Sequence, residues 1–198
     1  MKLVIISGSS RENSQSLRVA QFLQSRVRTL SKLEPEIIDL HETPISVNPD
    51  DNYLGKKEPN FKKISDTIES CDALILISPE WAGSASPMLR ALLVFIGKAA
   101  SYKPALLVGV SSGRGGAYPI HELKAGGNKN NFITFLPEHL IFRNVEGMLK
   151  SDIPASEEEK YIRERSDYAI GILEAFAKAL KEVRSSGAVN LEKYPYGM

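Results

Sequence analysis

The first residues that could carry chemistry follow a short apolar run, Leu3–Ile6, at the N-terminus. They are a glycine, an arginine and three serines: Gly8, Arg11, Ser9, Ser14 and Ser16. A helical pattern begins directly after them. The first turn of a helix has N–H groups without partners and a partial positive charge, so hydroxyls and a guanidinium beside it can bind an anion. The alternative is a helix that is simply capped by serine, with no ligand.

Two common phosphate-binding patterns are absent from this segment. It lacks the Gly-x-x-x-x-Gly-Lys-[Ser/Thr] pattern of nucleoside-triphosphate sites and the Gly-x-Gly-x-x-Gly pattern of dinucleotide sites. These two negatives favour a phosphomonoester as the ligand. Flavin mononucleotide (FMN) fits that description.

Glycine- and serine-rich segments also follow two later apolar runs. Ala73–Ile77 is apolar at every position and precedes residues 78–84, and Ala105–Val110 precedes residues 111–116. Runs of this kind are typical of parallel strands buried on both faces. Because ligands bind beyond the carboxyl ends of such strands, we expect the three segments to form one crevice.

The elements that would position these segments alternate along the chain. Helical spacing predicts helices over Ser14–Ser31, after Pro59, over Pro87–Ala100 with Ser86 as its cap, and over Ala117–Ala125. Further strands are expected at Glu36–Leu40 and within His139–Val145, and a long loop at Thr43–Pro59 could cover a site. The pattern predicts an α/β fold: a doubly wound, five-stranded parallel sheet with helices on both faces.

A last, long helix follows the capping box that begins at Ser156. The helix is amphipathic, and one face is expected to carry Tyr161, Arg165, Tyr168, Ile172, Phe176, Leu180 and Val183. We expect one domain over residues 1–185 and a C-terminal tail over 186–198, which is either disordered or an interface arm. The run Ala91–Ile96 is apolar all round, which favours either deep core or a subunit contact.

Composition excludes several classes of function. The 198 residues carry a net charge of +1, which gives no reason to expect a nucleic-acid or membrane partner. No apolar run approaches the length of a membrane span, and no signal-peptide pattern is present. The single cysteine, Cys71, fits a cytoplasmic protein and is expected to be a buried structural thiol. The three histidines lack metal-ligand spacing, so no metal site is expected.

Together the three segments resemble the NAD(P)H-dependent FMN reductases, a flavodoxin-like family that also includes quinone, azo-dye and chromate reductases. The resemblance rests on Gly8-Ser9-x-Arg11-x-x-Ser14-x-Ser16, Ser78-Pro79-Glu80-Trp81-x-Gly83-Ser84 and Ser111-Ser112-Gly113-Arg114-Gly115-Gly116. It covers roughly the first 125 residues of the chain. The chain departs from the family at Trp81-Ala82, where the family usually has Tyr-Asn.

The resemblance implies a role for each segment. The FMN phosphate would be held by Ser9, Arg11, Ser14 and Ser16. The flavin ring would lie along Pro79, Glu80, Trp81, Ala82, Gly83 and Ser84. Its pyrimidine edge would meet Ser112, Gly113, Arg114, Gly115 and Gly116. No catalytic side chain is required, because the flavin carries the chemistry.

The function implied is an FMN-dependent NAD(P)H oxidoreductase. Hydride would pass from NADPH or NADH to bound FMN and on to a small-molecule acceptor such as a quinone or free flavin. A homodimer or homotetramer is expected. Two alternatives remain open: a flavodoxin-type electron carrier, and a divergent, non-catalytic module that binds flavin or phosphate.

Overall fold

A computed structural model describes residues 1–48, 51 and 58–197. Its five strands form one parallel sheet in the order β2-β1-β3-β4-β5. The strands are β1 (Lys2–Ser7), β2 (Glu34–Asp39), β3 (Ala73–Pro79), β4 (Pro104–Val110) and β5 (Thr134–Phe142). This is the doubly wound order of flavodoxin-like folds, in which the winding reverses between β1 and β3. The predicted fold class is confirmed.

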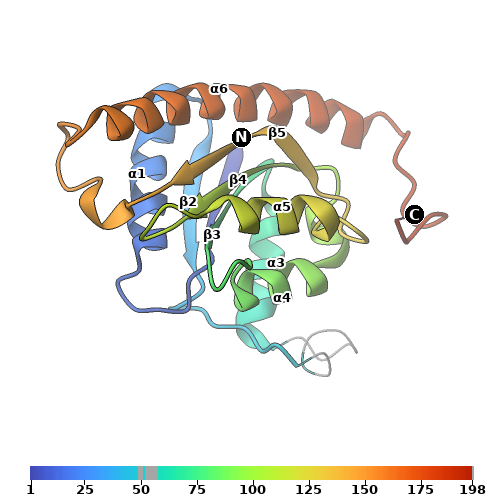
Figure 1. The fold of residues 1–198 in the computed structure, drawn as a ribbon. Coiled ribbons are helices and arrows are strands. Elements are labelled where there is room, and N and C mark those ends of the chain that lie inside the picture. The colour runs from blue at the N-terminus through green and yellow to red at the C-terminus, as the bar shows by residue number, and fades with distance from the viewer. Residues whose placement is uncertain (49–50, 52–57, 198) are drawn as a thin grey trace.

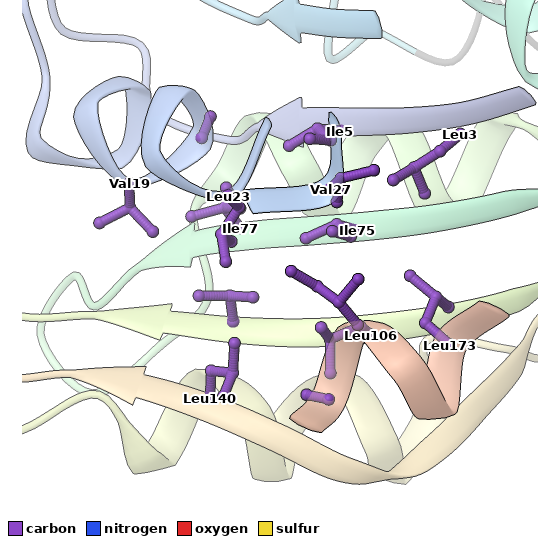
Figure 2. Close-up of a cluster of buried hydrophobic side chains, with 14 of the residues drawn as sticks. Leu3, Ile5, Val19, Leu23, Val27, Ile75, Ile77, Leu106, Leu140 and Leu173 are labelled. Atoms are coloured by element: carbon purple, nitrogen blue, oxygen red, sulfur yellow. The ribbon is translucent and has the colours of Figure 1, made fainter. Parts of the chain in front are cut away.

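Helices cover both faces of the sheet (Figure 1). The helices are α1 (Gln15–Leu30), α3 (Pro59–Ser70), α4 (Pro87–Phe95), α5 (Ala117–Gly126) and α6 (Glu157–Ser185). Alternate residues of one strand enter opposite cores: Leu3 and Ile5 pack with α1 and α6, whereas Val4 and Ile6 pack with α3 and α4. Figure 2 shows the first of these cores, with Leu23 of α1 and Leu173 of α6 against the strands. Burial on both faces explains the unbroken apolar runs Leu3–Ile6 of β1 and Ala73–Ile77 of β3.

Local signals explain where the helices begin. The Ser14 hydroxyl accepts a hydrogen bond from Leu17 N (3.1 Å) and caps α1. The Ser86 hydroxyl caps α4 in the same way, and the Ser156 hydroxyl caps α6. The helix predicted over Pro87–Ala100 ends earlier than expected, at Phe95, because Gly97 has φ +55° and a short 3₁₀ turn follows.

The last strand is longer than the sequence indicated. It begins at Thr134 rather than within His139–Val145, and its pairing with β4 is irregular where Ala105 pairs with Phe135 but Leu107 pairs with His139. The additional residues of β5 include Pro137. Proline has no N–H to donate to a neighbouring strand, so it is unfavourable within a strand and ended the apolar pattern that predicted one. Edge position and irregularity together explain why the strand was predicted short.

The buried face of α6 differs from the predicted one. Tyr161 and Tyr168 are exposed, and the core instead receives Ile162, Ser166, Ala169, Ile170, Leu173 and Ala177. These residues recur at three- and four-residue intervals, but several of them are small. The larger tyrosines therefore suggested the wrong stripe.

Three other predictions concern segments around this framework. The run Ala91–Ile96 is mainly core, since only Val94 in it is exposed and Phe95 is half-buried. The tail contacts the same chain: Lys98 Nζ donates to Leu191 O (2.6 Å) and Gly197 N donates to Asn130 Oδ1 (3.0 Å). Most of the second half of the predicted loop Thr43–Pro59 lies outside the described residues.

Candidate functional site

A cavity of about 410 Å³ lies at the carboxyl ends of β1, β3 and β4. The segment after β1 lines it with Ser9, Arg11, Glu12, Asn13, Ser14, Gln15 and Ser16. The ends of β3 and β4 and the segments after them contribute Pro79, Glu80, Trp81, Val110, Ser111 and Ser112. The three glycine- and serine-rich segments therefore do converge, and the volume is within the range of small-ligand sites.

The segment after β1 is held close to β3 and α4. Gly8 N donates to Ile77 O (2.9 Å), and Ser86 Oγ donates to Gly8 O (2.6 Å). A Cβ on Gly8 would lie 2.5 Å from Ile77 O, which only glycine avoids. The first strand end is thus fixed to the second by backbone contacts that need this residue.

The N-terminus of α1 offers donors to the cavity. The Ser9 and Ser14 oxygens accept from Arg11 N and Leu17 N, and each hydroxyl still has a proton to donate. Gln15 N and Ser16 N belong to the first helical turn and have no partner within the helix. Ser16 is 1 % exposed and its hydroxyl has no hydrogen-bond partner in the structure. A buried, unpartnered hydroxyl in a cavity beside two free N–H groups fits an anionic ligand.

Arg11 links the first segment to the second. Its guanidinium carbon lies 5.7 Å from the centroid of the Trp81 ring, within the range of a cation–π contact. Arg11 is exposed and Trp81 is half-buried. The contact places a permanent cation and a flat aromatic ring at the same edge of the cavity.

Residues 81–84 form a tight turn that projects beyond the cavity. Trp81 N donates to Ser84 O (3.0 Å) and Ser84 N donates to Trp81 O (2.9 Å). Ala82 and Gly83 both have positive φ, +48° and +78°, as in a type I′ turn. Ala82, Gly83 and Ser84 are exposed and do not line the cavity. Asn is strongly preferred at the first central position of such a turn, which gives a backbone reason for the family's Asn where this chain has Ala82.

The segment after β4 turns back toward Glu80. The Glu80 carboxylate accepts a hydrogen bond from Gly116 N, and Gly116 has φ +98° at the start of α5. Of the predicted residues in this segment, Ser112 lines the cavity, whereas Gly113, Arg114, Gly115 and Gly116 are not among its lining residues.

Residues after β5, which the sequence analysis did not select, complete the site. Val145 and Glu146 line the cavity, and Arg18 of α1 donates to Val145 O. Arg143 Nε donates to Arg114 O (2.8 Å) and Gly115 O (3.1 Å). Arg143, Val145 and Glu146 could have been found in the sequence only from their position after the last strand. That strand was predicted too short to draw attention to them.

Cys71, the single cysteine of the chain, does not line this cavity. Burial raises the pKa of the Cys71 thiol to about 11, so the thiol stays protonated, as expected of a structural cysteine. Within residues 1–48, 51 and 58–197, no group of His, Cys, Asp and Glu side chains is arranged to hold a metal ion. Among the same residues, no helix is both long and apolar enough to cross a membrane.

Comparison with known proteins identifies the family of this chain. The family model for NADPH-dependent FMN reductase matches residues 1–146. This range includes the cavity-lining residues at and after the ends of β1, β3, β4 and β5. An FMN-dependent NADPH-azoreductase of Staphylococcus aureus is 30 % identical over 128 residues, which cover 63 % of this chain and 68 % of the relative.

Solved structures share the fold. The flavoenzyme NAD(P)H:acceptor oxidoreductase FerB of Paracoccus denitrificans superposes with a TM-score of 0.68 at 20 % identity, covering 91 % of this chain and 97 % of that one. An NAD(P)H:quinone oxidoreductase of Methanothermobacter marburgensis has a TM-score of 0.58 at 13 % identity, covering 86 % and 97 %.

Proposed function

Since the chain belongs to the NADPH-dependent FMN reductase family and is an FMN-dependent oxidoreductase, we propose that it binds FMN in the cavity beyond β1, β3 and β4. The observation that carries the placement is the buried Ser16 hydroxyl, which has no partner in the structure and lies at the N-terminus of α1. The family assignment favours the enzyme over the two alternatives, an electron carrier and a non-catalytic module.

Each segment would have a distinct task. Ser9, Ser14, Ser16 and the first N–H groups of α1 would donate to the phosphate, and Arg11 would supply the balancing charge. Trp81 would pack against the ring, while the 112–116 segment would present backbone to its pyrimidine edge. When bound, FMN supplies the two-electron redox chemistry that joins nicotinamide oxidation to reduction of the acceptor.

The remaining assignments concern partners. We propose NADPH as the electron donor, because both the family model and the azoreductase relative are described as NADPH-dependent. The acceptor would be a small oxidised molecule such as a quinone, an azo compound or free flavin. We further propose a cytoplasmic homodimer or homotetramer. In that assembly α4 could offer little beyond Val94, because most of its apolar run is core.

Flavin titration of an Arg11→Ala variant tests the phosphate assignment. Loss of a charge-assisted hydrogen bond should weaken FMN binding by about 1.5–3 kcal/mol, roughly tenfold to a hundredfold. Riboflavin, which has no phosphate, should bind both proteins equally. The matched control is Arg28→Ala, an exposed arginine at the other end of α1. Equal FMN affinity for the wild type and Arg11→Ala would contradict the assignment.

A further inference from the structure

The segment 112–116, called here the ring-edge loop, is held from both sides. It follows β4, which lies between β3 and β5 in the sheet. From the β3 side, the Glu80 carboxylate accepts a hydrogen bond from Gly116 N. From the β5 side, Arg143 Nε donates to Arg114 O (2.8 Å) and Gly115 O (3.1 Å). Two side chains of opposite charge, one from each neighbouring strand end, thus bind consecutive peptide groups of one loop.

The fit at Gly115 and Gly116 leaves no space for a side chain. A Cβ on Gly115 would lie 2.7 Å from the nearer Glu80 carboxylate oxygen, and a Cβ on Gly116 would lie 2.5 Å from the Ile141 side chain. Gly116 also adopts φ +98°, which favours glycine. In addition, Asn144 N donates to Gly113 O (2.8 Å), which ties the loop a second time to the residues after β5.

The two contacts differ in what they satisfy. Arg143 pairs with carbonyl oxygens, whereas Glu80 pairs with the N–H group of Gly116, the N-cap residue of α5, at the end of the helix where an anion is favoured. Both side chains are half-buried, so their charges are less screened than those of surface groups. Each side chain is therefore suited to fix the ring-edge loop and to influence the electrostatic potential beside it.

We propose that Arg143 and Glu80 are positioning residues that hold the ring-edge loop in place for the flavin pyrimidine edge and set the local charge there. This inference rests on the proposed function, in which that loop meets the flavin. It assigns Arg143 a role that neither the motif nor the cavity lining indicated. Both residues act through the loop.

The test compares binding of FMN and riboflavin to the full-length chain. Arg143→Met should weaken both ligands by the same factor, roughly threefold to tenfold, the worth of an ordinary hydrogen bond. An equal loss of affinity for both ligands indicates a change at the flavin ring, which FMN and riboflavin share. A change at the phosphate site, as in Arg11→Ala, should weaken binding of FMN alone. The control is Arg26→Met, which removes a remote arginine that donates twice to Asp167 (2.8 and 2.6 Å); its flavin affinities should match those of the wild type.

The midpoint potential of bound FMN provides a readout that a purely structural role would not move in this way. Reduced flavin carries more negative charge on its pyrimidine side, so removal of a cation nearby should lower the potential and removal of an anion should raise it. We expect a lower potential in Arg143→Met and a higher one in Glu80→Gln, which keeps an acceptor for Gly116 N. Arg143→Lys, which keeps the charge, should stay nearer the wild-type potential than Arg143→Met.

Amide hydrogen exchange in the chain without flavin gives a third readout. Exchange in residues 113–117 should be faster in Arg143→Met than in the wild type, and unchanged there in Arg26→Met. Wild-type flavin affinities, potential and exchange in Arg143→Met would overturn the inference and leave the proposed function intact. Failure of the wild-type chain to bind FMN would overturn both.

Discussion

Ser14 and Ser16 stand two residues apart at the start of α1 and have different roles. Ser14 uses its oxygen to cap the helix, as any N-terminal serine could. Ser16 is more deeply buried than Ser14, at 1 % exposed, and its hydroxyl has no hydrogen-bond partner in the structure. An unsatisfied buried hydroxyl costs stability. A serine-capped helix and an anion site were alternatives in the sequence. In the structure Ser14 caps the helix, and the unpartnered Ser16 hydroxyl fits an anion site.

Ala82 occupies a backbone conformation that costs most residues stability. With φ +48° it lies at the first central position of the type I′ turn 81–84. Ala82→Asn should therefore raise the free energy of unfolding by about 0.5–1 kcal/mol, as measured by urea denaturation. Ala82→Val, a β-branched residue at the same position, should lower it. If the Asn and Val variants were equally stable, the turn could not have this conformation in solution.

At the scale of elements, the sequence predicted those whose signals are local. The central strands contain the apolar runs that predicted them, and Ser86 and Ser156 cap helices where expected. The predictions that were wrong depended on neighbours. The start of β5 depends on its pairing with β4, and the buried face of α6 depends on small residues that fit against the sheet.

In the candidate site, too, the residues with local sequence patterns were predicted and those that depend on distant contacts were not. The segments after β1, β3 and β4 carry glycine and serine patterns that could be found in the sequence. Arg18 and Arg143 could not, because each contacts backbone carbonyls far away in the chain and no spacing rule connects them. A long side chain that binds a distant carbonyl leaves no local pattern.

The start of α6 depends on a buried carboxylate, Glu159. It accepts hydrogen bonds from Leu149 N (3.0 Å), Ala155 N (2.9 Å) and Arg163, and so closes the loop that precedes the helix. Burial acts to raise the pKa of Glu159, but the hydrogen bonds from Ala155 N, Arg163 and Leu149 N outweigh it and the pKa is lowered. The folded state therefore favours the ionised carboxylate.

Glu159→Gln should lower the free energy of unfolding by about 2–4 kcal/mol near pH 7, because it leaves Arg163 without its carboxylate. A lowered folded pKa gives stability that is fully present above the ordinary value of 4.5 and is lost as pH falls through the folded pKa. The difference between wild type and variant should accordingly shrink below about pH 4.5. Urea denaturation across pH measures it, and Glu157→Gln, an exposed residue of the same turn, is the control. A difference that is constant down to pH 3 would contradict this role.

At the scale of the whole molecule, the proposed ligand would contact three strand ends of one sheet. The sheet is the shared wall of both hydrophobic cores, so its strands cannot separate at one end without disturbing both layers. A ligand that binds only the folded state across these ends should therefore stabilise the entire domain. The stabilisation by FMN should decrease when Arg11, the proposed phosphate ligand, is removed. It should not change when an ion pair far from the cavity, such as Arg26–Asp167, is removed.

Thermal unfolding with and without flavin measures this coupling. FMN at about a hundred times its Kd adds roughly 2.7 kcal/mol, which for a domain of this size corresponds to a rise in Tm of roughly 5–10 °C. At the same FMN concentration the rise should be smaller in Arg11→Ala, because the affinity is lower. In Arg26→Met the Tm without flavin should fall, since the ion pair between α1 and α6 is lost, but the rise on adding FMN should equal that of the wild type. An equal rise in wild type and Arg11→Ala would mean that FMN stabilises the chain from a place other than the N-terminus of α1.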